Sequence, residues 1–281
     1  MIFLVVLLVL LIDKLTDWRR DVQHDGPWLQ LLRRVEGRTD MASRPWLSLS
    51  LLVLLPVLVL GLLLMALKPL AYGWLSLPLH LLVLLYSLGR GQGKREFGAF
   101  RDAWRRGDDN AAALVAERDL GLGAPDAPDA PSLLRAVEAQ LLWRSHQGFF
   151  AVIFWYVLLG PMATLAYRLL ALTIEHTGSE AMRERAGQLR HAFDWLPVRL
   201  LLVSFGLVGN FVAMNRALLQ DLLRWEAPAP RLLADVGPAA ADLHEPYEGE
   251  AGISRLDSLA ALLVRTRMLW YAAIALWTLL V

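Results

Sequence analysis

The sequence contains no cysteine, and this absence removes several classes of function at once. None of the 281 residues can form a disulfide, act as a thiol nucleophile or hold a metal through a thiolate. An excess of charge of either sign is also lacking, because 28 basic residues stand against 27 acidic ones. We therefore expect no nucleic-acid partner, since binding a phosphate backbone relies on clustered positive charge.

Histidine is scarce, and the other usual signatures of a catalytic or metal site are missing. The six histidines are scattered without a metal-ligand spacing, and no nucleophile elbow accompanies them. The segment "GRGQGKREFG" (89–98) superficially resembles a phosphate loop. That loop requires Ser or Thr after the lysine, however, and here Lys94 is followed by Arg95. We interpret this segment as a basic cytoplasmic anchor, and we expect no metal site.

Apolar residues are abundant, at 56% of the chain with a mean hydropathy of +0.43, which is typical of a membrane protein. Two runs, 46–67 and 70–89, are long enough to cross a bilayer and are separated only by Lys68 and Pro69. The pattern predicts a tight helical hairpin. His80 lies within the second run, where we expect a neutral imidazole bonded to a neighbouring helix rather than a metal ligand.

Two further apolar runs follow, and the first of them is interrupted. Residues 149–174 contain Gly160-Pro161, so they form either one kinked span or two half-helices that enter and leave on the same side. The other run, 198–215, begins inside the sequence "FDWLPVRL" (193–200). We interpret that sequence as the start of a helix.

The residues of "FDWLPVRL" each suit the beginning of a membrane helix. Asp194 would serve as N-cap and Pro197 would occupy the first turn. Trp195 would lie at the membrane interface, and Arg199 would extend to the headgroups or pair with Asp194.

The two ends of the chain, 1–12 and 268–281, are apolar but too short to cross a bilayer alone. The first lacks both a basic n-region and a cleavage site, so we expect it to remain in the mature protein. The second becomes long enough if it begins near residue 258, with Arg265 and Arg267 extending to the headgroups.

The distribution of Lys and Arg predicts the orientation in the inner membrane. Seven lie in 13–45 and six in 90–106, against one in 67–70, so the hairpin tip should face outward. The flanks of 198–215 are both arginine-rich. One of the later apolar segments, 149–174 or 198–215, is therefore re-entrant or the charge rule is broken.

The polar segments are also expected to be helical. Phe97, Phe100 and Trp104 share one face of an amphipathic helix that ends at Gly107, and Asp108 would cap an alanine-rich helix after it. A Pro/Gly/Ala loop follows at 121–131, and Ser132 would cap the next helix. Residues 225–255 read as an acidic, proline-broken loop.

The densest group of polar residues surrounds the third apolar run. Arg168 lies inside that run and needs a partner, for which Glu175, Asp194 and Asp13 are candidates. If 149–174 folds as a hairpin, the polar residues meet at one membrane surface beneath Trp143 and Trp195; otherwise they are ordinary helix-end charges. The candidate functional cluster comprises Arg144, His146, Gln147, Arg168, Glu175, Asp194 and Arg199.

Three segments together resemble the AmpE family: "FGAFRDAWRRGDDNAA", "FFAVIFWYVL" followed by "LGPMATLAYRL", and "FDWLPVRL". The resemblance covers most of the chain in order. It implies a multi-pass protein of the bacterial inner membrane that modulates or senses a signal linking peptidoglycan recycling to β-lactamase induction. It further implies the amidase AmpD or a muropeptide as a partner, besides the lipid bilayer.

The same residues resemble, more distantly, the CobD/CbiB amide-forming proteins, which use ATP. Those proteins carry an "ENTVDG"-type segment before an apolar run ending "ALAYK", and later "WIPARL". Here "LAYR" and "WLPVRL" match in kind, but Trp143, Arg144, Ser145 and Gln147 replace the polar signature. The resemblance thus leaves two alternatives: a modulator without enzymatic activity, or a ligase that uses ATP and Mg²⁺ on another substrate.

Taken together, the sequence predicts an all-α, multi-pass membrane protein with four to six membrane segments, one of which can be re-entrant, and cytoplasmic helical loops. We expect a single domain, 1–281, with these parts: an N-terminal apolar helix and basic segment (1–45), a helical hairpin (46–89), a cytoplasmic helical insert (90–148), membrane segments bearing the polar cluster (149–215), a cytoplasmic loop (216–267) and a C-terminal apolar segment (268–281).

Overall fold

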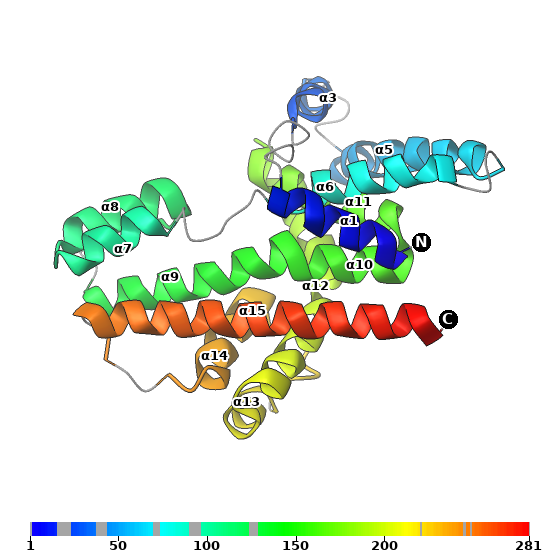
Figure 1. Cartoon of the computed structure of the whole chain (residues 1–281). Helices are drawn as coiled ribbons and strands as arrows, with labels where there is room; N and C mark the ends of the chain where they lie inside the picture. Colours follow the sequence, from blue (N-terminus) through cyan, green and yellow to red (C-terminus); the bar gives the residue numbers. More distant parts are fainter. Residues whose placement is uncertain are drawn as a thin grey trace. The chain divides into compact units, whose positions relative to one another are not determined.

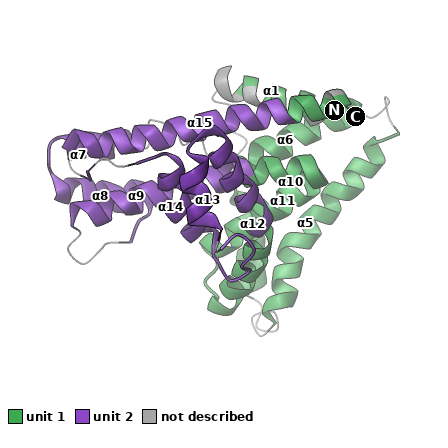
Figure 2. Ribbon diagram, turned by 90° about the horizontal axis from the view of Figure 1, so that it is seen from below, with its two compact units in different colours: residues 1–91, 151–194, 274–281 green, residues 92–150, 195–273 purple. Residues whose placement is uncertain are grey.

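Every regular element that the structure describes is a helix, as the sequence predicts (Figure 1). The chain forms two compact units, coloured separately in Figure 2. The first comprises residues 1–91, 151–194 and 274–281, and the second comprises 92–150 and 195–273. The computed structural model describes residues 2–15, 24–37, 44–69, 74–89, 97–123, 129–219, 221–243, 246–247 and 249–280.

The first unit is built around an apolar core shared by helices from distant parts of the sequence. Trp28, Leu32 and Val35 lie on one face of an amphipathic helix and pack against Leu52 and its neighbours, with Trp28 Nε1 donating to Leu52 O at 3.4 Å. Leu169, Leu170 and Met182 complete this core. The helices of the first unit are α1 (Ile2–Leu15), α3 (Gly26–Glu36), α5 (Pro45–Leu67), α6 (Leu77–Ser87), α10 (Ala151–Leu159), α11 (Pro161–His176) and residues 180–194 of α12 (Glu180–Val208).

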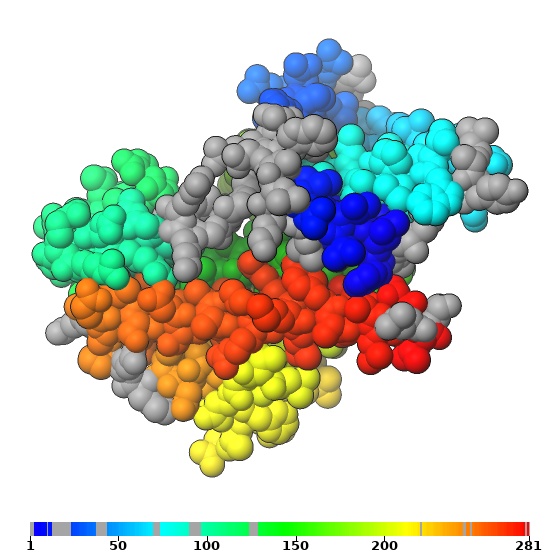
Figure 3. All heavy atoms as spheres, in the orientation of Figure 1, coloured from blue at the N-terminus to red at the C-terminus, as the bar shows by residue number. Residues whose placement is uncertain are grey.

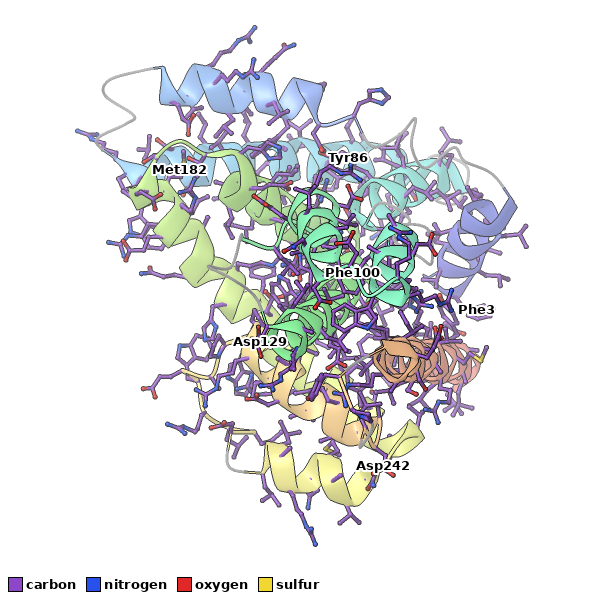
Figure 4. The ribbon with its side chains drawn as sticks, turned by 90° about the vertical axis from the view of Figure 1, so that its left-hand side faces the viewer. Phe3, Tyr86, Phe100, Asp129, Met182 and Asp242 are labelled. Carbon is purple, nitrogen blue, oxygen red and sulfur yellow. The ribbon has the colours of Figure 1, made fainter. Side chains whose placement is uncertain are left out.

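The second unit has a separate core beneath the predicted amphipathic helix. Phe97, Phe100 and Trp104 are all at most 5% exposed, which confirms their expected face; Phe100 is labelled in Figure 4. Asp108 accepts a hydrogen bond from Ala111 N at 2.9 Å, as a predicted N-cap should. This unit contains α7 (Gly98–Arg105), α8 (Asp109–Leu120), α9 (Ala130–Ser145), a π-helix (His146–Phe150), the rest of α12, α13 (Phe211–Leu218), α14 (Ala229–Ala240) and most of α15 (Gly249–Leu280).

One local prediction in the second unit is wrong. α9 begins at Ala130, so Ser132 lies inside its first turn and donates its hydroxyl to Asp129 O rather than capping the helix. The acidic, proline-containing segment 225–255 contains α14 and the start of α15. Two prolines lie within α14. Pro230 lies in the first helical turn, where no N–H donor is needed, and Pro238 lies inside the helix close to its end.

Three of the described helices are long and apolar enough to cross a membrane: α5, α12 and α15. α5 is the most apolar of the three, and only 22% of its most apolar 18-residue stretch is buried. The rest of its surface therefore suits contact with lipid. The predicted span at 70–89 is shorter among the described residues, as an apolar helix at Trp74–Ser87. α1, with 14 residues, extends about 21 Å and is too short to cross alone, as expected.

The interrupted run 149–174 is two helices, not one kinked rod. Gly160 has a φ of +77°, which a residue with a side chain rarely adopts, and Pro161 starts α11 without needing an N–H donor. α10 and α11 then pack against each other, so the chain turns back at Gly160. The run is thus broken into two helices at Gly160, and the expectation that both enter and leave on the same side of the membrane stays a prediction.

Candidate functional site

Three side chains with complementary charge and hydrogen-bonding groups are buried together in the first unit. Tyr167 OH donates to Asp194 Oδ1 at 2.6 Å, and Arg190 Nε lies 3.0 Å from Asp194 Oδ2. Arg190 Nη2 also donates to Tyr167 OH at 2.7 Å, which closes a ring of contacts. All three residues are at most 5% exposed. A buried ion pair whose charged groups also take part in hydrogen bonds is the arrangement that such burial requires.

Helix geometry explains how these residues meet. Arg190 and Asp194 are four residues apart on α12, so their side chains lie on the same face one turn apart. Tyr167 reaches them from α11. The interpretation of Asp194 as an N-cap is therefore wrong, because α12 begins at Glu180, fourteen residues earlier. The first turns of α12 contain many good helix formers, but these residues are polar. A pattern of apolar runs therefore does not indicate this part of the helix.

Pro197 also lies inside α12, not in its first turn. A proline in a helix leaves the carbonyl four residues earlier without its N–H partner, and that carbonyl belongs to Phe193. Trp155 Nε1 donates to Phe193 O at 3.2 Å, and the Trp155 and Phe193 rings lie 4.9 Å apart. An indole from α10 thus supplies the hydrogen bond that the proline removes.

This compensation predicts a dependence between two substitutions. Trp155→Phe should lower the free energy of unfolding by about 1–3 kcal/mol, because the Phe193 carbonyl then lacks a donor. In a Pro197→Ala background the same substitution should cost less, because the introduced alanine restores the helical N–H. A double-mutant cycle in mixed detergent–SDS micelles measures the difference; additive effects would contradict the assignment.

A second cluster of the same three residue types lies in the first unit. Tyr86 OH donates to Asp25 Oδ1 at 2.9 Å, and Arg168 Nη2 lies 3.4 Å from Asp25 Oδ2 (Figure 4 labels Tyr86). The partner of Arg168 is therefore Asp25, and the expected pairing with Glu175 or Asp194 is wrong. Glu175 is exposed, Asp194 is engaged with Arg190, and the side chain of Asp13 is outside the described residues.

His80 has the environment that the sequence predicts. Its Nδ1 lies 2.9 Å from Tyr156 OH, and the two rings meet edge to face. The neighbouring helix is α10, which carries Tyr156 with its side chain fully buried. The histidine is thus a hydrogen-bonded structural group, as expected.

Arg199 neither extends to the headgroups nor pairs with Asp194, as the sequence suggested it would. It is 5% exposed and donates to the carbonyls of Trp195 at 2.8 Å, Arg224 at 2.6 Å and Leu222. Its guanidinium also lies 4.1 Å from the Trp195 ring centre. Arg199 therefore holds the turn after α13 against α12 within the second unit.

The remaining predicted residues lie at the end of α9 and in the π-helix. Arg144 Nη2 lies 3.3 Å from Asp119 O, and His146 is fully buried with its ring stacked on Trp143. Gln147 is partly buried in the π-helix. Arg118 bonds the Asp119 side chain and lowers the pKa of that carboxyl.

The seven predicted residues divide between the two units. Arg168, Glu175 and Asp194 belong to the first, whereas Arg144, His146, Gln147 and Arg199 belong to the second. The shared pocket beneath Trp143 and Trp195 stays a prediction. Within the first unit, Arg168 and Asp194 belong to two separate clusters that adjacent residues of α11, Tyr167 and Arg168, help to form.

The sequence identifies the charged residues of these buried pairs better than it identifies the residues with which they pair. Arg190 and Asp194 carry a readable signal, since they are four residues apart. Asp25 carries none, because 143 residues separate it from Arg168. The same holds for Arg255 and Glu138, a pair only 2% exposed on each side and 117 residues apart, which make two contacts at 2.7 and 3.1 Å.

Clusters of potential metal ligands and cavities are the other features that could form part of a site. Within the part of the chain that the structure describes, no group of three His, Asp or Glu side chains is close enough to hold a metal ion. The buried carboxylate of Asp194 is already bound to Arg190 and Tyr167. A cavity of about 230 Å³ in the first unit is smaller than most ligand pockets. It is lined by Val35, Glu36, Pro45, Ser48, Gly178, Ser179 and Met182.

The long apolar helices define an α-helical membrane protein. Comparison with known proteins narrows this class. The family model for the regulatory signalling modulator protein AmpE matches residues 1–226 of the 281, and the chain belongs to the AmpE family.

The chain is also similar to two curated proteins. Protein AmpE of Shigella flexneri is 27% identical over 216 residues, covering 73% of this chain and 73% of that protein. The cobalamin biosynthesis protein CobD of Stutzerimonas stutzeri (strain A1501) is 25% identical over 252 residues, covering 84% of this chain and 80% of that protein. No solved structure matches.

Proposed function

We propose that the protein is an inner-membrane modulator or sensor that couples peptidoglycan recycling to β-lactamase induction. The observation that carries this proposal is the match to the AmpE family over residues 1–226. The apolar helices support a membrane location, and the buried Tyr167–Arg190–Asp194 cluster joins two helices whose packing a partner would alter. AmpD or a muropeptide would be the partner that receives or supplies the signal.

In this proposal the Tyr167–Arg190–Asp194 cluster sets the state of the first unit. Tyr167 on α11 and the Arg190–Asp194 pair on α12 join two helices through hydrogen bonds of 2.6 and 2.7 Å. A partner that favours another packing of α11 on α12 must break or replace these bonds. Its differential affinity for the two packings would then be the signal.

The test is β-lactamase induction in a strain that lacks the protein. The strain is complemented with the native chain, Tyr167→Phe or Arg168→Ala, and a chromogenic cephalosporin reports induction by a β-lactam. We expect a several-fold change for both variants at unchanged membrane abundance. Arg231→Ala, at an exposed arginine of α14, is the control and should behave as native. Equal induction with and without the whole protein would refute the proposal.

A second candidate function is an ATP-dependent ligase, and the similarity to CobD over 84% of the chain favours it. The replacement of the CobD/CbiB polar signature by Trp143, Arg144, Ser145 and Gln147 speaks against CobD-like chemistry. Thermal denaturation of detergent-purified protein separates the two functions. A ligand that binds the folded state raises the midpoint, so ATP·Mg²⁺ should act under the ligase alternative and an anhydromuramyl peptide under the sensor proposal.

A further inference from the structure

α13 and the turn after it hold a group of large apolar side chains at the surface of the second unit. Their exposed fractions run from 54% for Phe211 and Trp225 to 80% for Leu223. In Figure 3 the side chains of α13, in yellow, form a face that no other segment covers in that view. We call this surface the α13 platform; it comprises Phe211, Val212, Leu219, Leu223 and Trp225.

The opposite face of α13 is firmly packed. Met214 and Leu218 are each 3% exposed, and α13 packs against α14. Asn210 caps α13 by accepting a hydrogen bond from Ala213 N at 3.0 Å, and its amide donates to Asp242 Oδ1 at 2.9 Å. Figure 4 labels Asp242 at the end of α14. The packing of the inward side chains therefore fixes the orientation of α13 and the direction of its outward face.

The turn that carries Leu223 is fixed by a buried cation. Arg199, 5% exposed, donates to the carbonyls of Leu222 and Arg224. The Trp225 ring lies 6.0 Å from that of Trp195 on α12. Burial of an arginine is costly unless its donors are satisfied. The carbonyls of this turn accept hydrogen bonds from Arg199, so the turn is an integral part of the fold.

The break between α12 and α13 is also built in. A Cβ atom on Gly209 would lie 2.3 Å from the backbone oxygen of Ala240, which cannot move aside as a side chain could. Asn210 N donates to the same oxygen at 2.8 Å. α13 therefore does not continue α12 as one straight helix. The predicted apolar span 198–215 is interrupted, because α12 ends at Val208.

Within the same unit, α12 carries an apolar stripe and is a helix suited to the membrane. Leu196, Leu200, Val203 and Leu207 of α12 are 37–66% exposed and recur at spacings of four, three and four residues. Such spacing places them on one face of the helix. α12 is among the helices long and apolar enough to span a bilayer, so this face is suited to lipid.

We propose that the α13 platform lies in the plane of the membrane interface, with its apolar side chains inserted at the boundary of headgroups and acyl chains. Trp225 is of a residue type enriched at this depth. The exposed Arg216 on α13 suits anionic headgroups. The occupant is thus the lipid bilayer itself, and α13 neither spans it nor projects into water.

The lack of cysteine makes the test direct, because a single introduced cysteine carries the only label. Leu219→Cys and Leu223→Cys are labelled with an environment-sensitive fluorophore in the full chain. The proteins are reconstituted in phosphatidylethanolamine–phosphatidylglycerol vesicles containing lipids spin-labelled near the headgroup or near the chain end. Two leucines of matching exposure serve as references: Leu114 on α8 (64%) and Leu58 near the middle of α5 (63%), compared with 62% for Leu219.

We expect the fluorophores at 219 and 223 to be quenched by the shallow spin label several times more than by the deep one. The label at 114 should be quenched by neither, and the label at 58 should be quenched more by the deep probe. Quenching at 219 and 223 as weak as at 114 would overturn the proposal. So would deep quenching as at 58, or a disulfide between two copies of the unlabelled Leu219→Cys variant at low protein-to-lipid ratio.

Discussion

Asp194→Ala should lower the free energy of unfolding by about 3–5 kcal/mol, because it leaves the Arg190 guanidinium buried without its counter-charge. Tyr167 OH would lose its acceptor as well. Stability measured by SDS titration in mixed micelles should therefore fall steeply for this variant. The protein concentration and the lipid content of the micelles must be held constant, since both alter the apparent midpoint.

The chain provides a matched control for this substitution. Arg231 and Asp235 on α14 have the same residue types and the same four-residue spacing, but both side chains are more than half exposed. Asp235→Ala should change stability by no more than about 1 kcal/mol. The triple variant Tyr167→Phe/Arg190→Met/Asp194→Leu should recover most of the loss, since it leaves neither a buried charge nor a buried hydroxyl without a partner. Equal effects at 194 and 235 would contradict the burial argument.

Glu138→Ala should have an effect of similar size in the second unit, about 3–5 kcal/mol. The Arg255 guanidinium makes two contacts with the Glu138 carboxylate and lies 3.9 Å from the Tyr247 ring centre. Removing the carboxylate leaves a cation that is 2% exposed. Because α9 and α15 share this pair, amide hydrogen exchange should accelerate in both helices.

A surface ion pair in the same unit provides the comparison. Arg105 and Glu250 lie 3.2 Å apart, but their side chains are 50% and 77% exposed. Glu250→Ala should therefore leave exchange in α9 unchanged and shift stability by about 1 kcal/mol or less. If Glu138→Ala alters exchange in α5 as much as in α9, the effect is not confined to the second unit and the prediction fails.

The parts of the fold that could be predicted are those whose signal is local. The apolar run of α5, the cap at Asp108 and the buried face of Phe97, Phe100 and Trp104 all follow from spacing within about ten residues. The hydrogen bond of His80 to a neighbouring helix was also expected, because a polar group inside an apolar segment needs a partner.

The parts that could not be predicted depend on contacts between distant residues. Asp194 and Pro197 suit a helix start by residue type, yet α12 begins at Glu180 and Trp155 from another helix supplies the missing hydrogen bond. The partner of Arg168 is likewise 143 residues away. A single sequence contains no information on such pairs, because many acidic residues would satisfy the same arginine.

The buried pairs of the first unit also determine how the protein responds to an electric field. Arg190 with Asp194, and Arg168 with Asp25, each sum to zero formal charge. The membrane potential acts on net charge at about 2.3 kcal/mol per elementary charge per 100 mV, so displacing either pair as a body involves no net electrical work. Translation of either cluster along the membrane normal is therefore not biased by a change in membrane voltage.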